Sequence, residues 1–589
     1  SATLFPISRF LNSPFKTKHL HLADFFRTYS TVIDCIEIES CFIDVYGGDC
    51  SSTNPWNEQG YILSEGLRNI DWNIQILYME NQTHISQVKK CHDVFNVPKN
   101  GSSVSFPFCA ASFGVFNTGA GSTEICYRRS KPSARLFDLN IESRDPLVGV
   151  NVMLYLPPKF YNETAVRSST RYLMLSSRLD SFGLIPEISP GEISVVTSII
   201  ALLAVARAIG QHFAVFERAA YTSDRHVIIA FFDGESFDYI GSSDVSYDMM
   251  KGEFPRKPRS DIKTQLDPII TSQLDGLIEL QQLGTGNGRE LNAHADGSQV
   301  RTERYIRSKL NLLDSKMPPS SWYSFERSSP SIRGIVLAPF RKKYEYSRIN
   351  SMLDRVQWNA TQRSTAFSEV IIAASAVLRA AMDHVRLPAA QKPTIKIDSE
   401  FCFIDSSDWF SCEFFNRING GRFKPSSEFY SGKSTYVSAG YRNPIRFFVE
   451  WLAIYATGST AHTSNVKDKK TCDDLGKDQN VYLFTWQADP ITGTYYCYRT
   501  SMIVHQVNSP AFRIDGVVLF HYFSNGTYST WTESLYNIEN LQLYLVEEES
   551  FEKVMLCLGV ALALISFLVI NTLFCIVMYL RGRHGEDIL

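Results

Sequence analysis

The chain has 589 residues, with 58 Lys and Arg against 61 Asp and Glu, and a formal net charge of -3. This balance excludes a strongly basic protein of the kind that binds nucleic acid. Because 44% of the residues are hydrophobic and only 20% are charged, the chain can bury cores and is not disordered throughout. At about 100–200 residues per domain, its length predicts a few domains.

The N-terminal region, residues 1–130, is rich in cysteine. Six cysteines lie there and four more lie in the region 401–553, whereas residues 127–401 contain none. An even number in two groups is typical of disulfides formed in an oxidising compartment, and each bond typically contributes about 2–4 kcal/mol. The sequence has no paired CxxC spacing, which disfavours a zinc site. The ten residues are Cys35, Cys41, Cys50, Cys91, Cys109, Cys126, Cys402, Cys412, Cys472 and Cys497.

Residues 131–400 show the pattern of an α/β domain. Short β-branched or aromatic runs alternate with helical periodicities, as in strands of a parallel sheet joined by crossover helices. Tyr172–Leu175 and His226–Phe232 are predicted strands. The segment 190–210 is a predicted helix, because it opens with Pro and Gly and stops at Gly210.

Polar loops follow both predicted strands. Ser177–Ser181 comes after the first, and Asp233–Ser243 comes directly after the second. In open α/β sheets, sites form just past the carboxyl ends of the strands. We therefore expect the two loops to lie side by side and to hold any chemistry that the chain performs.

The order of motifs in this domain resembles the zinc-aminopeptidase superfamily, which also includes transferrin receptor. The motifs are RLDS at Arg178–Ser181, PGEIS at Pro190–Ser194 and DGES at Asp233–Ser236. In the peptidases, HxDS, GAxDN and DGEE motifs, a later Asp and a final His complete two zinc sites, and one Glu is the general base.

Most positions that would hold zinc carry unsuitable residues. Asp180 is retained, and Glu235 corresponds to the general base. The other matched positions are Arg178 for the first His, Ser194 for the bridging Asp, Ser236 for the second Glu, Asp275 for the late Asp and Ser347 for the final His. We therefore expect no metal, no cofactor and no peptide hydrolysis. The alternatives are a membrane-anchored zinc aminopeptidase with an atypical metal site and, more distantly, a receptor for a soluble ligand.

Glu235 could act in two ways. It could bind the free amine of a substrate, as aminopeptidase clefts do, with Arg178, Asp180 and Tyr239 as the other substrate-binding residues. Such a charge-assisted pair would contribute about 1.5–3 kcal/mol. In the hypothesis that we favour, the turn's carboxylates engage Arg178 or nearby amides and hold the two loops together, because a buried carboxylate is destabilising when unpaired.

Residues 554–580 form the strongest predicted element, a membrane-spanning helix. No formal charge interrupts this stretch, and it exceeds the about 20 residues that cross a bilayer core. Arg581 and Arg583 follow it, so the positive-inside rule places the tail, residues 581–589, in the cytoplasm and the preceding chain outside or in the lumen. Lipid cannot satisfy the polar side chain of Asn571, which we expect to face partner subunits in the membrane.

Five N-glycosylation sequons lie before the span, in agreement with a luminal ectodomain. They are at Asn81, Asn100, Asn162, Asn359 and Asn525. Removal of an export signal before Ser1 would fit the same topology.

The departures from the peptidase motifs resemble the nicastrin family, the large glycoprotein subunits of gamma-secretase. The family's DYIGSS motif is intact at Asp238, Tyr239, Ile240, Gly241, Ser242 and Ser243. Further matches are FPFCA at Phe106–Ala110, CYRRS at Cys126–Ser130 and YSTWTES at Tyr528–Ser534. Together these motifs cover most of the chain from about Cys91 to Leu580.

This resemblance implies a fold and a set of partners. The fold is a bilobed ectodomain with a mixed, largely parallel sheet flanked by helices, standing on one transmembrane helix. Residues 1–130 would be the small lobe, 131–400 the aminopeptidase-like large lobe and 401–553 a C-terminal part that packs on the lobes. The implied partners are presenilin, which carries the proteolytic aspartates, and two smaller multi-span subunits.

The resemblance also implies a function and a location. The function is to support assembly of the intramembrane protease and to select type I membrane protein stubs with shed ectodomains, as in Notch signalling and amyloid precursor protein processing. The location is the endoplasmic reticulum, Golgi, plasma membrane and endosomes. The implied disulfides are Cys91–Cys109 and Cys472–Cys497, while Cys402 is close enough in sequence to pair with Cys412.

Overall fold

The computed structural model divides into two compact units. Unit 1 contains the described residues of segments 73–118 and 536–589, and unit 2 contains those of segment 119–535. The described residues are 81–98, 106–113, 144–159, 169–181, 189–255, 266–285, 291–295, 311–313, 317–341, 344–346, 348–350, 353–356, 358–397, 435, 437, 444–460, 466, 468–478, 482–488, 494–512, 528–529, 531–534 and 541–585. The predictions that fall outside them concern Cys35, Cys41, Cys50, Cys126, Cys402, Cys412, Asn100, Asn162, Asn525 and Ser347.

Unit 1 combines a helix with a two-stranded sheet. Helix α3 (Gln82–Phe95) begins after Asn81, whose side chain accepts hydrogen bonds from two amides of the first turn. Strand β1 (Phe108–Phe113) pairs antiparallel with β15 (Leu541–Val546). This pairing unites the N-terminal and C-terminal segments of the unit.

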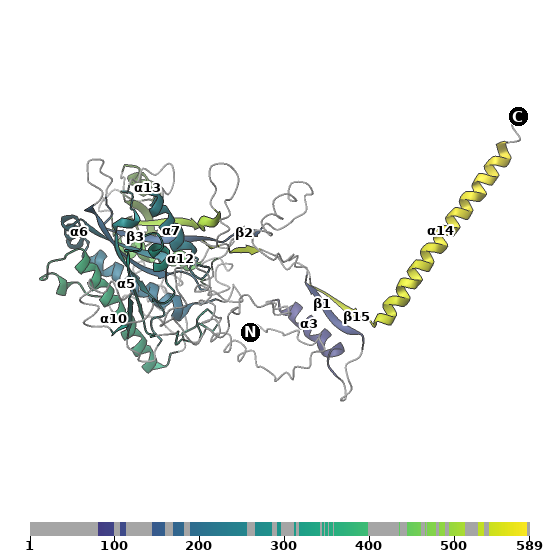
Figure 1. Ribbon diagram of the computed structural model, residues 1–589, viewed down its shortest axis with the longest axis horizontal. Helices are drawn as coiled ribbons and strands as arrows, with labels where there is room; N and C mark the ends of the chain where they lie inside the picture. Colours follow the sequence, from purple (N-terminus) through teal and green to yellow (C-terminus); the bar gives the residue numbers. More distant parts are fainter. Residues whose placement is uncertain are drawn as a thin grey trace. The chain divides into compact units, whose positions relative to one another are not determined.

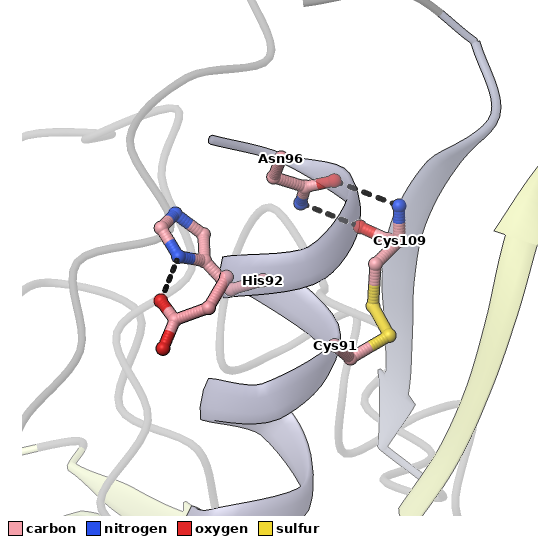
Figure 2. The surroundings of a disulfide bond; sticks show 5 residues. Cys91, His92, Asn96 and Cys109 are labelled. Atoms are coloured by element: carbon pink, nitrogen blue, oxygen red, sulfur yellow. Dashed lines mark hydrogen bonds and ion pairs between the residues drawn. A yellow bond between two sulfur atoms is a disulfide. The ribbon is translucent and has the colours of Figure 1, made fainter. Parts of the chain in front are cut away.

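A disulfide and an asparagine side chain fix β1 to α3 (Figure 2). Cys91 of α3 is bonded to Cys109 of β1, with Cα atoms 5.7 Å apart. The side-chain amide of Asn96 donates to the Cys109 carbonyl (2.8 Å), and its oxygen accepts from the Cys109 amide (2.7 Å). Asn96 thus satisfies both backbone groups of Cys109, as a neighbouring strand would. The disulfide is the one that the family resemblance implies.

Helix α14 (Glu549–Gly585), the long yellow helix of Figure 1, contains the predicted membrane span. Two other described helices, Glu192–Gln211 and Ala360–His384, are long and apolar enough to cross a membrane, but both are mostly buried in unit 2. The stretch Lys553–Leu580 is instead wholly exposed. Among the described helices, only α14 presents an apolar surface of this length to its surroundings, as a lipid-facing helix must.

The polar side chains of the span bond to their own helix. Ser566 donates to the carbonyl of Leu562 (2.8 Å), and Asn571 donates to the carbonyl of Phe567 (2.9 Å). One amide hydrogen of Asn571 therefore has an acceptor without a partner helix. The predicted contact of Asn571 with partner subunits remains a prediction.

Unit 2 is built around an eight-stranded mixed sheet (Figure 1). Its four central strands run parallel, and antiparallel strands flank them. In sheet order the strands are β13 (Met502–Asn508), β3 (Val148–Leu156), β5 (Arg225–Phe232), β4 (Arg171–Arg178), β6 (Leu274–Leu280), β9 (Arg333–Ala338), β7 (Asn292–Ala295) and β8 (Asn311–Leu313). The predicted strands are confirmed as β4 and β5, and the predicted fold class is confirmed.

Helices cover both faces of this sheet. One core packs α5 (Thr197–Gln211), α10 (Ala360–His384) and α12 (Pro444–Thr457) on one face. A second core packs α7 (Ile240–Lys251) and α9 (Trp322–Glu326) on the other. Alternate side chains of β5 enter the two cores, which explains why that strand is apolar without interruption.

The helix predicted over 190–210 is present with two differences. Its first turn is a π-helix, η5 (Glu192–Val196), and α5 continues to Gln211. Gly210, predicted to end the helix, lies within α5, where a Cβ atom would come within 2.1 Å of the Ala456 carbonyl oxygen. This glycine therefore allows α12 to approach α5 closely instead of terminating the helix.

Smaller elements complete the described part of unit 2. A second disulfide, Cys472–Cys497, is again one that the resemblance implies and joins α13 to β12. The remaining helices and strands are α6 (Phe213–Ser223), α13 (Lys469–Asp478), the pair β2 (Arg144–Pro146) and β14 (Thr532–Ser534), and the sheet β10 (Ser459–Thr460), β12 (Tyr495–Thr500) and β11 (Leu483–Ala488). The 3-10 turns are η6 (Thr271–Gln273), η7 (Lys392–Thr394) and η8 (Pro510–Phe512).

Two of the predicted sequons lie in described residues. Asn81 and Asn359 are exposed and cap the first turns of α3 and α10 through their side-chain oxygens. Glycosylation uses the side-chain nitrogen, so capping and attachment of sugar are compatible at both positions.

Candidate functional site

The loops that follow β4 and β5 lie side by side, as predicted. The two strands are parallel neighbours, with Ser177 opposite Phe231. The carboxylate of Asp180 accepts hydrogen bonds from the backbone amides of Glu235 (2.8 Å) and Ser236 (2.9 Å). Asp180 is fully buried, so it holds the two strand ends together through both of its oxygens.

A tight turn carries the chain from β5 into α7. The carbonyl of Gly234 accepts from the amides of Phe237 and Ile240. Asp238 and Tyr239 both adopt left-handed backbone conformations, with φ of 60° and 57°, and for Tyr this conformation is strained. The turn therefore has a specific geometry that places Glu235 against the first turn of α7.

The turn also depends on close backbone contact at Gly241. A Cβ atom at this position would lie 2.5 Å from the carbonyl oxygen of Asp233 and 2.6 Å from the side-chain oxygen of Asn151. Asn151 of β3 accepts from the amide of Asp233 and donates to the carbonyl of Gly241. The glycine of the DYIGSS motif is thus required by packing.

Hydroxyl and amide groups of the protein saturate the Glu235 carboxyl. One oxygen accepts from the Ser242 amide (2.8 Å), and the other accepts from the hydroxyls of Ser242 (2.8 Å) and Ser321 (2.6 Å). Burial raises the pKa of Glu235 to about 8, although hydrogen bonds from Ser321 and Ser242 oppose the rise. At neutral pH the group is therefore largely a neutral acid, and in that form its own O–H donates to one of the two serine hydroxyls, which can accept as well as donate.

A second buried acid, Glu279, was missed by the sequence analysis. It lies near the carboxyl end of β6, opposite Ser176 of β4. Its carboxyl accepts from the Gln281 side chain (2.6 Å) and from the Ser321 amide (2.8 Å), and burial raises its pKa to about 7. Ser321 thus bridges Glu235 through its hydroxyl and Glu279 through its backbone amide.

Arg178 supplies positive charge at this end of the sheet. Its side chain is half-buried, and its charge lowers the pKa values of Asp180 and Glu279, against the larger effect of burial. Tyr239, the other residue predicted to contact substrate, is also half-buried and immediately precedes α7. The structure therefore brings Arg178, Asp180, Glu235 and Ser236 to the carboxyl ends of adjacent strands.

Asp275 does not belong to this group, and the prediction that it occupies the late Asp position is corrected here. It lies at the amino end of β6, where it pairs with Arg225 (2.5 Å) and Arg171 (3.5 Å). A strand rises about 3.3 Å per residue, so the length of β6 places Asp275 and Glu235 at opposite edges of the sheet. Glu279 is the acid that β6 contributes to the edge where Glu235 lies.

Ser194, at the predicted bridging position, has a carboxylate partner from a distant loop. Asp354 accepts from the amide of Ile193 (3.0 Å), from the amide and hydroxyl of Ser194, and from the hydroxyl of Tyr346 (2.9 Å). Asp354 is fully buried, and burial raises its pKa. Asp354 thus binds the first turn of η5 through hydrogen bonds. No pattern in the sequence indicated that Asp354 is the partner of Ser194.

The residues present do not fit a dinuclear zinc site. Both Asp180 oxygens accept backbone amides, and both Glu235 oxygens are occupied by protein donors. Guanidinium and hydroxyl groups stand at three matched ligand positions, and neither kind of group provides the ligands that zinc requires. Within the described ranges, no three His, Cys, Asp or Glu side chains come together in a way that could hold a metal ion.

Fold and site together define an α/β domain with the motif order of a zinc aminopeptidase, in which hydroxyl and amide groups of the protein hold the buried carboxyls. The domain family described as the nicastrin large lobe matches residues 171–384, and the one described as the nicastrin small lobe matches residues 38–119. Nicastrin of Caenorhabditis elegans is 38% identical over 552 residues, which are 87% of this chain and 75% of that protein. The chain therefore belongs to the nicastrin family.

Two other relatives are less similar in sequence. Human nicastrin is 25% identical over 569 residues, covering 87% of this chain and 74% of that protein. The crystal structure of the gamma-secretase component nicastrin matches with a TM-score of 0.48 and 17% identity, covering 80% of this chain and 77% of that chain.

Proposed function

We propose that the chain is a non-catalytic, membrane-anchored subunit of gamma-secretase that supports assembly with presenilin and two smaller multi-span subunits. Family membership supports this, because a nicastrin of known structure is a gamma-secretase component. The exposed apolar helix α14 suits a single-pass type I protein. Its ectodomain would lie in the lumen of the endoplasmic reticulum, Golgi and endosomes or outside the plasma membrane.

The proposed contribution to substrate selection is steric. The observation that carries it is the saturation of Glu235 by Ser242 and Ser321. A substrate amine would have to displace a serine hydroxyl and draw a proton from a buried acid, which opposes binding. In this proposal the ectodomain excludes substrates that still carry bulky extracellular domains, and the cleft acts as a rigid scaffold.

Recognition of a substrate N-terminus is the second candidate. Arg178 is half-buried beside Asp180, so the end of the cleft is polar, and Glu235 could accept an ammonium group if the Ser321 segment moved. Tyr239 would then contact the substrate. The steric proposal ranks first because it requires no rearrangement of the Ser321 contacts.

One comparison separates the two candidates. Cleavage of three stubs by the reconstituted complex would be measured: one with a free N-terminus, one with an acetylated N-terminus and one with a folded domain added. We expect acetylation to leave cleavage unchanged and the added domain to suppress it. Loss of cleavage on acetylation, with tolerance of the added domain, would contradict steric selection.

A variant pair supplies the matched control. Ser321→Ala removes the hydroxyl donor to Glu235 and makes the carboxyl more available, whereas Ser329→Ala removes an exposed hydroxyl of the same segment. Under steric selection neither variant prefers free amines over acetylated stubs. A new preference for free amines in Ser321→Ala would favour the N-terminus candidate.

A further inference from the structure

The segment 528–534, called here the exit segment, docks on the same turn and helices that hold Glu235. Trp531 donates from its indole nitrogen to the carboxylate of Asp238 (2.7 Å). Its ring lies against Phe237, with centroids 5.7 Å apart at 74°. Asp238 and Phe237 belong to the turn that follows β5, so one side chain of the exit segment contacts that turn by both polar and apolar groups.

The apolar part of this contact forms a small core of its own. Leu147, Phe237, Ile240 and Val437 are almost completely buried, and Trp531 packs against them. The last three residues of the exit segment form β14, which pairs with β2. Tryptophan is well suited to this position because its ring can be buried while its N–H reaches a polar partner.

The exit segment also contacts α7 and the residue that follows α9. Tyr528 makes an edge contact with Tyr247 of α7 (5.8 Å) and lies beneath the guanidinium of Arg327, which directly follows α9 (4.6 Å). The same two helices are joined by a seam of serine hydroxyls that includes Ser242 and Ser324 (2.9 Å apart). The segment therefore touches each element that positions the Glu235 carboxyl.

We infer that Asp238 and Trp531 form an internal latch that couples the geometry of the Glu235 turn to the segment through which the chain leaves unit 2 towards its membrane helix. The exit segment precedes the membrane helix in the chain, because β14 ends at Ser534 and α14 begins at Glu549. Displacement of the turn releases Trp531, and displacement of the exit segment releases Asp238.

Backbone strain makes the turn responsive to this contact. Asp238 and Tyr239 are consecutive residues at positive φ, a conformation that persists only where surrounding contacts impose it. The Trp531 hydrogen bond ends on one of these two residues. Loss of the Trp531 hydrogen bond therefore removes a contact that holds Asp238 at positive φ, so the backbone of the turn can change conformation more easily. The coupling is reciprocal, as any thermodynamic linkage is.

Hydrogen exchange of the full-length chain in detergent micelles tests the latch. Trp531→Phe removes the N–H donor and keeps an aromatic ring against Phe237. We expect amides of the turn and first turn of α7, residues 239–243, to exchange about tenfold faster or more, as loss of a hydrogen bond to a charged group predicts. Asp238→Ala should accelerate exchange of the exit-segment amides to a similar degree. Asp238→Asn keeps a side-chain oxygen that can accept from Trp531 and should therefore accelerate this exchange less.

Two controls make the result decisive. Trp486→Phe makes the same substitution at a half-buried tryptophan of β11, which stacks on Tyr495, and should leave residues 239–243 unchanged. The double variant Asp238→Ala/Trp531→Phe should exceed the larger single effect by little, because both changes break one contact. The latch is overturned if Trp531→Phe accelerates exchange only in the exit segment, if the two effects multiply, or if Trp486→Phe has the same effect.

Discussion

Glu235→Gln should remove a specific pH dependence from the stability of unit 2. Burial raises the pKa of Glu235 from its ordinary 4.5 to about 8. The folded chain therefore retains a proton that the unfolded chain releases above pH 4.5. Because the folded state binds more protons, the stability contributed by this group is complete below pH 4.5 and is lost as the pH rises through 8.

The size of the effect follows from the same shift. Each pKa unit corresponds to about 1.4 kcal/mol, so full ionisation of Glu235 costs about 5 kcal/mol, of which about 3 kcal/mol is lost by pH 7. Glutamine cannot ionise. The unfolding free energy of the variant minus that of the wild type should therefore rise by about 3 kcal/mol between pH 4.5 and 7 and level off above pH 8. A constant offset of about 1 kcal/mol is expected because the new amide nitrogen cannot accept the hydrogen bond that the replaced oxygen accepts from Ser242.

Denaturant unfolding of the full-length chain in detergent, repeated across this pH window, measures the difference. Glu279→Gln is a matched control: burial raises the pKa of Glu279 only to about 7, so its difference curve should level off about one pH unit earlier. Glu253→Gln removes an exposed carboxyl and controls for loss of one charge. A Glu235→Gln difference that is flat across the window, or that Glu253→Gln reproduces, would refute the reasoning.

The remaining predictions concern the groups around this acid and the core behind it. Ser321→Ala should lower the unfolding free energy by about 1–3 kcal/mol, because it leaves Glu235 without one donor; an unchanged denaturation midpoint would contradict the bridging role. His505 is buried and its pKa is lowered to about 4 by burial, so its contribution is complete above pH 6.5 and is lost as the pH falls towards 4. His505→Gln should therefore reduce the decrease in unfolding free energy between pH 6.5 and 4 by up to about 1.4 kcal/mol per pH unit. An unchanged slope of unfolding free energy against pH would contradict this prediction. Gly241→Ala should cost about 3 kcal/mol, because its Cβ meets backbone atoms. Gly252→Ala, which has open space and only a positive φ, should cost about 1 kcal/mol, and equal losses in the two variants would contradict the packing argument.

Local patterns in the sequence predicted the strands and their shared edge, but not the partners of the acids. The apolar run 226–232 is typical of a strand covered on both faces, and this predicts that the polar loop after it lies at the carboxyl edge. Ser321 and Asp354 reach Glu235 and Ser194 from loops far along the chain. A single serine or aspartate in a polar loop carries no periodic signal, so tertiary packing alone decides its partner.

The error at Asp275 has a simple geometric cause. The segment 274–280 contains two acids, and the motif comparison selected the first. Because the strand extends through all of these residues, its first acid lies at the amino edge, and Glu279 is the one that lies at the carboxyl edge near Glu235. Finding the strand's extent before assigning the acid would have identified Glu279. The pairing of β1 with β15 lacked any such signal, since antiparallel partners distant in sequence share no local pattern.

Zinc binding tests the central claim most directly, namely that protein hydroxyls and amides, and not metal ions, hold the carboxyls of Asp180 and Glu235. The purified full-length chain would be incubated with zinc and dialysed, and its metal content and aminopeptidase activity would be measured beside those of Glu235→Gln. The account predicts no stoichiometric zinc and no hydrolysis by either protein. Two zinc ions per chain, with peptide hydrolysis that Glu235→Gln abolishes, would contradict it.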